Sequence, residues 1–275
     1  MVIAAASACS DEIEPASLLD RPRIVGAHVQ VVEAPTRSSP HAGEHVLVDF
    51  YTASHDLSRG AYSTYALLVC PSDANNHSTT SCVGPDAGIF SGKDAQDPSV
   101  TLSAPAPSGE VMVFGIFCTS GVATLSTDAG ESRGSCDGGT GQEVSVRVSL
   151  GVDNLEPKLT ADALTLDGAP FPPDAPCESG GPTIPVDGAT HQIGFRTDLL
   201  GTEPEDSPVM MHLGTHGKLD RLYTEVQPGA DAQVSWKAPS DLGSPKESAR
   251  FHFVLRDGRG GTAFLIRTVC LQKGA

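Results

Sequence analysis

The stretch from Gln233 to Cys270 limits the fold of this 275-residue chain more than any other segment. Within it, Phe251, Phe253 and Leu255 alternate with other residues, and this period of two is typical of a β-strand with one buried face. The sequence DGRGG that follows supplies glycines for a hairpin turn, and the segment up to Cys270 is β-branched and apolar enough to return as a strand. The stretch therefore predicts three strands of a β-sandwich, the last two joined by a tight turn.

The same alternation assigns directions to the other side chains of this stretch. Trp236, the single tryptophan of the chain, shares a face with Val234 and is expected to pack in the core. His252, Arg256 and Arg259 are expected to face solvent. The stretch thus indicates a scaffold and offers no reactive group.

Composition extends this prediction to the whole chain. The 29 glycines and 21 prolines favour frequent turns, and no segment keeps a helical apolar period beyond about two turns. An all-β chain follows, and its length suits two domains. The formal net charge is −16 and the 18 basic residues are scattered, which argues against nucleic-acid binding and against electrostatic attraction to anionic lipid.

The two halves of the chain resemble each other. VTLSAP, which begins at Val100, matches VSWKAP, which begins at Val234, and a phenylalanine-bearing strand follows each. Gly43 precedes Phe50 at the same separation as Gly188 precedes Phe195. The shared order predicts a tandem repeat of one sandwich unit. We therefore expect a leader and tether at residues 1–22, a first immunoglobulin-like domain at 23–151 and a second at 152–275.

Apolar and β-branched runs predict strands in both halves. These runs are Ile24 to Val32, His45 to Thr52, Tyr62 to Cys70, Val100 to Ala104, Val111 to Thr119, Val144 to Leu150, Lys158 to Leu166, His191 to Thr197, Val209 to Leu213 and Leu219 to Val226. Two polar segments, Asp73 to Pro98 and Asp128 to Gly141, are expected to be loops, and Asp167 to Gly188 a proline-rich excursion.

The second half carries a family resemblance. Its acidic loop ending in Pro208, its VSWKAP segment and its FVLRDGRGGTA segment resemble the polycystin-type (PKD) and related immunoglobulin-like repeats of bacterial surface proteins. The whole chain is similar to lipoproteins of myxobacteria-like organisms, in which a cysteine anchor precedes two such domains. The resemblance implies tandem seven-stranded sandwiches on the cell envelope, and it implies no catalytic activity. The first half departs from the pattern, since Thr119-Ser120-Gly121 stands in place of the DGRGG turn.

The sequence contains no C-x-x-C pair, so a zinc site is not expected for its seven cysteines. So many cysteines without a metal motif indicate disulfides and an oxidising compartment. Cys9 follows small residues and resembles the lipobox of bacterial lipoproteins, which implies lipidation of its thiol and anchoring to the outer membrane, on its periplasmic or surface face. Six cysteines then remain, and these allow 15 disulfide connectivities. We expect Cys70 to pair with Cys82, Cys118 with Cys136, and Cys177 with Cys270.

Three candidate sites were weighed from the residues. The acidic set Asp198, Glu203, Glu205 and Asp206 could supply oxygen ligands for calcium, with solvated loop charge as the alternative. The G-x-S-x-G motif from Gly130 to Gly134 spells a nucleophile elbow, but it lies in a polar segment with no helix expected after it.

His212 and His216 have a spacing that binds zinc when it falls on a helix. The strand context favours surface histidines at a strand end instead.

These observations favour a non-catalytic envelope lipoprotein with a structural, adhesive or protein-binding role, whose partners are the membrane and another envelope protein. The alternative is a secreted hydrolase or a carbohydrate-active accessory protein. An enzyme of that kind should place an acid–base pair in one cleft, and the sequence offers no such constellation.

Overall fold

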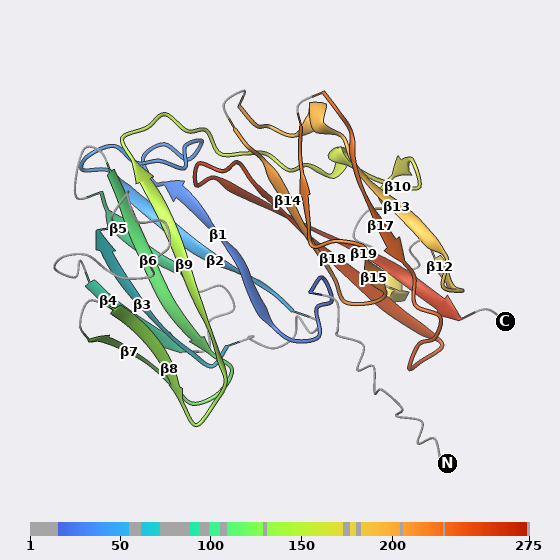
Figure 1. The fold of residues 1–275 in the computed structure, drawn as a ribbon, viewed down its shortest axis with the longest axis horizontal. Helices are drawn as coiled ribbons and strands as arrows, with labels where there is room; N and C mark the ends of the chain where they lie inside the picture. The colour runs from blue at the N-terminus through green and yellow to red at the C-terminus, as the bar shows by residue number, and fades with distance from the viewer. Residues whose placement is uncertain are drawn as a thin grey trace, which may run out of the picture.

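The chain is an all-β structure of two immunoglobulin-like sandwiches, seen side by side in Figure 1. The computed structural model describes residues 16–54, 62–71, 88–93, 99–104, 109–128, 131–172, 177–179, 183–203, 206–227 and 229–273. The helical segments among these residues are three 3-10 turns, at Ala161–Ala163, Cys177–Ser179 and Thr197–Leu199.

The first sandwich joins a sheet of order β1-β2-β5 to a sheet of order β4-β3-β6-β9. The strands are β1 (Arg23–Val31), β2 (His45–Ala53), β3 (Thr64–Pro71), β4 (Gly88–Lys93), β5 (Ser99–Ser103), β6 (Gly109–Cys118) and β9 (Gly141–Leu150). All their pairings are antiparallel, and the core between the sheets includes Val48, Phe50, Leu67 and Phe117.

The second sandwich joins a sheet of order β11-β10-β13-β17-β15 to a sheet of order β12-β19-β18-β14-β16. The first of these contains β10 (Leu164–Leu166), β11 (Ala169–Pro170), β13 (Thr190–Phe195), β15 (Lys218–Leu219) and β17 (Ala232–Lys237). The second contains β12 (Thr183–Val186), β14 (Val209–Gly214), β16 (Tyr223–Glu225), β18 (Lys246–Arg256) and β19 (Thr262–Lys273). Trp236 is fully buried in its core with Phe195, Phe251 and Phe253, as expected.

The internal repeat has a structural basis. β2 and β13 pair with β5 and β17 respectively, so the repeated sequences occupy matching positions in the two sandwiches. Ala104 donates its backbone N–H to the carbonyl of Glu44 at 2.9 Å, and Ala238 donates to Ala189 at 2.8 Å. Gly43 and Gly188, which precede these acceptors, have φ of 83° and 72°, a conformation that favours glycine.

Two of the segments expected to be loops contain strands. Within Asp73 to Pro98, β4 pairs with β3, and the flanking residues lie outside the described part of the chain. Within and just before Asp128 to Gly141, β7 (Val122–Asp128) and β8 (Glu131–Asp137) form a hairpin. The apolar side chains of this hairpin are few, so its sequence lacks the alternation that would predict a strand.

Candidate functional site at the seam between the sandwiches

The outer faces of the two sandwiches meet in a second apolar cluster, which we call the seam. Val254 on β18 and Phe264 on β19 lie on the face of their sheet that points away from the core of the second sandwich. They face Tyr51 at the end of β2, close to the start of β1. The seam consists of buried Leu19, Val25, Ala53, Met211, Leu213 and Val254, with Tyr51, Leu222 and Phe264 packed against them.

Polar contacts complete the seam. The Tyr51 ring stacks on Phe264 at 4.2 Å, and its hydroxyl lies 3.3 Å from Nδ1 of His252. Arg256 donates from Nη2 to the backbone carbonyl of Val25 at 2.6 Å. Our prediction that His252 and Arg256 face solvent is therefore wrong: His252 is fully buried and Arg256 half-buried. The alternation located their face correctly, but another domain covers that face.

Burial determines the chemistry of His252. The pKa of its imidazole falls to about 4, first because burial disfavours the charged form and second because Arg250 lies nearby. The Tyr51 hydroxyl faces the ring from the first sandwich. Because the folded protein holds this ring neutral, the seam is expected to weaken in acid.

A polar junction closes one end of the seam. Asn154, in the linker between the sandwiches, is fully buried, and its Nδ2 donates to Ser38 at 2.7 Å and to Oδ2 of Asp257 at 2.9 Å. Asp257 opens the DGRGG turn and also accepts the backbone N–H groups of Arg259 and Gly261. Burial raises the pKa of Asp257, although these hydrogen bonds act in the opposite direction. The turn predicted from sequence thus joins the two sandwiches.

Glu156 strengthens the same junction. Its Oε1 lies 3.1 Å from Nε2 of His28 in the first sandwich and accepts the backbone N–H of Thr262 in the second at 3.4 Å. The linker also pairs with each sandwich through its backbone, since Glu156 donates to Thr36 and Lys158 donates to Gly201. The connection is therefore held on both sides.

Two of the four acidic residues considered for calcium, Glu203 and Asp206, take part in this junction. Arg259 donates from Nε to Asp206 at 2.9 Å and from Nη2 to Glu203, while Asp198 lies next to Arg196 at 3.2 Å. Glu205 lies outside the described residues. Within the described ranges, no three histidine, cysteine or acidic side chains lie close enough to hold a metal ion. Calcium binding here stays a prediction, and in the structure the carboxylates of Glu203 and Asp206 pair with the guanidinium of Arg259.

His212 and His216 do not form a common site. His212 is fully buried in the core of the second sandwich, 6.0 Å from the ring of Phe195, so our prediction of a surface position is wrong for it. Burial lowers its pKa to about 4.

His216 bridges Glu247 at Nε2 and Thr215 at Nδ1, each at 2.9 Å. This arrangement resembles a nucleophile–histidine–acid chain in its connectivity. Thr215 is buried, however, and its hydroxyl accepts the backbone N–H of Arg250. A nucleophile must be accessible to its substrate, so we assign these three side chains to fixing the loop after β14 against β18.

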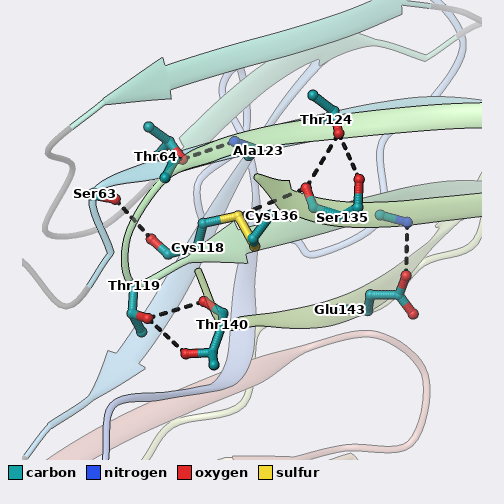
Figure 2. Close-up of a disulfide and its surroundings, with 12 residues drawn as sticks. Ser63, Thr64, Cys118, Thr119, Ala123, Thr124, Ser135, Cys136, Thr140 and Glu143 are labelled. Carbon is teal, nitrogen blue, oxygen red and sulfur yellow. Dashed lines mark hydrogen bonds between the residues drawn. A yellow bond between two sulfur atoms is a disulfide. The ribbon is translucent and has the colours of Figure 1, made fainter. Parts of the chain in front are cut away.

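A disulfide fastens the β7–β8 hairpin to the first sandwich. Cys118, at the end of β6, is bonded to Cys136 on β8, as Figure 2 shows. Ala123 and Leu125 pack with Ile116 on the outer face of the β4-β3-β6-β9 sheet. The backbone N–H of Ala123 also donates to the hydroxyl of Thr64 on β3 at 3.0 Å. In the sequence, the hairpin stands between the paired strands β6 and β9, where the second sandwich has the DGRGG turn, and it adds a layer to the outer face of their sheet.

Of the other cysteine predictions, one is confirmed, and two concern residues outside the described part of the chain. Cys177 is bonded to Cys270, which ties the segment before β12 to β19, as expected. Cys82, the expected partner of Cys70, lies outside the described residues, and so does Cys9. Gly130 of the G-x-S-x-G motif lies outside the described residues, and Glu131 to Gly134 lie on strand β8, which is not the strand-to-helix turn that a nucleophile elbow requires.

Within the described part of the chain, no helix has the length and apolar character needed to cross a membrane.

The sequence of the chain matches no family model and no curated protein. Among solved structures, it is similar to the D0-D1 domain of intimin, at 12% identity over 89% of this chain and 99% of that one, with a TM-score of 0.24. It is also similar to the N-terminal Ig1-2 module of Drosophila receptor protein tyrosine phosphatase DLAR, at 11% identity over 93% of this chain and 100% of that one, with a TM-score of 0.25.

A third similar structure is Escherichia coli alpha-2-macroglobulin activated by porcine elastase, at 9% identity over 90% of this chain and 22% of that one, with a TM-score of 0.23. Such low TM-scores carry no argument about function. The assignment as immunoglobulin-like rests on the strand order of the chain itself, with β2–β5 and β13–β17 pairs packed against the opposing sheets.

The residues of the seam were missed by sequence reasoning, although one signal was present. Phe253, Val254 and Leu255 form a continuous apolar run inside an alternating strand. Such a run indicates a strand that is buried on both faces. In the structure all three residues are fully buried.

Proposed function

We propose that this protein is a non-catalytic, lipid-anchored protein of the bacterial envelope whose two sandwiches form one rigid adhesive or protein-binding module. The observation that carries this proposal is the seam, because the two sandwiches are joined by an apolar cluster and by a buried polar junction. Two domains held in one orientation present a preorganised surface to a partner, which reduces the entropy cost of binding.

The hydrogen-bond partners of the histidine and arginine side chains favour a structural role over a catalytic one. His216 with Glu247, and Arg259 with Glu203 and Asp206, are pairs that fasten loops to strands. The disulfides at Cys118 and Cys177 favour an oxidising compartment, which is compatible with the envelope.

The anchor can be tested directly. The chain should be expressed in a bacterial host behind a complete lipoprotein leader, and the N-terminal peptide of the mature protein analysed by mass spectrometry. We expect diacylglycerol on Cys9 and recovery in the membrane fraction, with both lost in Cys9→Ser. An unmodified Cys9 peptide in a protein that fractionates as soluble would refute the anchor.

The binding role requires a separate experiment. Immobilised protein should be exposed to envelope extract after mild cross-linking, with the seam variant Val254→Asp as the matched control. We expect a partner that is retained by the native protein and lost or weakened in the variant, because the variant loosens the seam without changing any solvent-exposed side chain. Equal capture by both proteins would contradict a rigid two-domain surface, and hydrolysis of a glycan or peptide substrate by the native protein would contradict the non-catalytic role.

A further inference from the structure

The residues just before β1 do not behave as a free tether. Within the expected tether from Ser10 to Pro22, Ser17 and Leu19 are buried, so this prediction is wrong for the described part of that segment. We call Ser17, Leu18 and Leu19 the strap. Leu18 forms a parallel bridge with Gly214 at the end of β14, with Leu19 donating to the Gly214 carbonyl at 2.8 Å and Gly214 donating to the Ser17 carbonyl at 2.9 Å.

The strap contacts both sandwiches. Leu19 is fully buried in the seam with Val25 and Ala53 of the first sandwich and Met211 and Leu213 of the second. Its backbone pairs with the second sandwich, while the covalent chain continues into β1 of the first. In Figure 1 the blue segment that precedes β1 lies between the two halves.

A short loop fixes the strap to the start of β1. Arg23 donates from Nη1 to the carbonyl of Ala16 at 2.9 Å and pairs with Asp20 at 3.0 Å. The hydroxyl of Tyr62 donates to the carbonyl of Pro22 at 3.2 Å. The strap therefore enters the first sandwich through a closed turn, and a displacement of the strap would be passed to β1.

The seam is consequently held at two ends. β14 runs from Val209 to Gly214, a span of roughly 17 Å for five residue steps. At the Val209 end, Ser207 donates to the backbone of Asp257, so this end lies against the DGRGG turn and the linker. At the Gly214 end lies the strap. A single attachment would allow one sandwich to rotate relative to the other about that point, and a second attachment at the far end of β14 prevents this rotation.

We propose that the strap is a latch that locks the angle between the two sandwiches, and that withdrawal of the N-terminal segment releases a hinge at the linker. The latch consists of two backbone hydrogen bonds, the 3.4 Å hydrogen bond from the Ser17 hydroxyl to the carbonyl of Leu219, and one buried leucine, so it can open without unfolding either sandwich. A pull on the chain upstream would act on the seam before it acts on the core of the first sandwich. This inference concerns the chain itself and does not depend on lipidation of Cys9 or on any partner.

Leu19→Ala and Leu18→Ala form a matched pair for testing the latch. Both remove the same atoms from neighbouring positions, but only Leu19 belongs to the buried cluster of the seam. In hydrogen exchange, we expect the Leu19 and Gly214 amides to exchange at least tenfold faster in Leu19→Ala than in the native protein, with a smaller change in Leu18→Ala. In small-angle X-ray scattering, we expect a larger radius of gyration for Leu19→Ala only.

Exchange rates in β2 and β13 serve as the folding control, because these strands lie in the two cores. If Leu19→Ala does not fold, exchange in the native protein decides the question: the Leu19 and Gly214 amides should open at lower free energy than the amides of β18. Scattering profiles that are identical for the native protein and a folded Leu19→Ala would overturn the latch. So would native Leu19 and Gly214 amides that open only with the global unfolding of the chain.

Discussion

At the scale of single residues, the two buried histidines show how position alters an ordinary side chain. His212 lies in the core of the second sandwich and His252 in the seam, and burial lowers the pKa of each to about 4. The folded state therefore favours the neutral ring, whereas the unfolded chain protonates it near pH 6.5. The stability that each ring contributes is complete above pH 6.5 and is lost as the pH falls from 6.5 toward 4.

We predict that His212→Leu removes part of this acid sensitivity. The fall of the His212 pKa to about 4 corresponds to roughly 3 kcal/mol of stability between neutral pH and pH 4. Urea unfolding of the native protein and of His212→Leu at pH 7 and pH 4 measures the difference. The variant should lose less stability than the native protein on acidification, and an equal loss in both would contradict a neutral buried His212.

Asp257 and Asn154 give a second prediction at this scale. Asp257→Ala should lower the free energy of unfolding by roughly 3 kcal/mol, because the buried amide of Asn154 and the N–H groups of the turn lose their acceptor. The double variant with Asn154→Ala should cost about 1–3 kcal/mol less than the sum of the two single variants, since the residues are in contact. Thermal and urea unfolding of the four proteins measures the cycle, and strictly additive losses would argue against the junction.

At the scale of elements, the two disulfides close loops of different lengths. Cys118 and Cys136 are 18 residues apart, while Cys177 and Cys270 are 93 apart. Loop-closure entropy grows with the logarithm of this separation, so the expected contributions are about 3 and about 5 kcal/mol. The first bond holds an added hairpin, whereas the second holds an edge segment against the core strand β19.

We therefore predict that Cys177→Ala with Cys270→Ala destabilises the protein more than Cys118→Ala with Cys136→Ala. Removal of the Cys118–Cys136 disulfide should mainly accelerate hydrogen exchange within β7 and β8, because the sheet behind the hairpin keeps its own core. Urea unfolding and exchange mass spectrometry provide the two readouts. Loss of protection across β2 and β3 in Cys118→Ala with Cys136→Ala would show that the hairpin is not a separate layer.

At the scale of the whole molecule, the seam makes two sandwiches into one unit. Val254 is fully buried by contact with the other sandwich, and the polar junction and the strap hold the two ends of the same interface. Domains coupled by a well-packed apolar interface are expected to unfold together, whereas domains joined by a free linker unfold separately.

We predict that the native protein unfolds in a single calorimetric transition and that Val254→Asp splits it into two. A carboxylate at this position would be buried without a partner, so the seam should open to hydrate it. Val122→Ala, an exposed position on the hairpin, serves as the control and should retain the single transition. Two transitions in the native protein would contradict the coupling.

The fold of each sandwich could be predicted from the amino-acid sequence, because strand alternation and turn residues act locally. The run around Phe251 and Phe253, the DGRGG turn and the repeated VTLSAP and VSWKAP segments were sufficient to predict two related immunoglobulin-like units. Two disulfides were also predicted correctly, since short separations along the chain and elimination left few pairings.

Which outer faces are covered could not be predicted and became clear from the packing of the two sandwiches. A period of two tells which residues share a face, but it does not tell whether water or another domain lies beyond that face. His252, Arg256 and Leu19 were therefore assigned to solvent or tether, although each contacts the other sandwich. The polar hairpin was missed for a related reason, since it packs few apolar side chains against a sheet formed by distant segments. What joins the two sandwiches depends on contacts between residues up to 231 positions apart, such as Val25 and Arg256, and no local pattern encodes them.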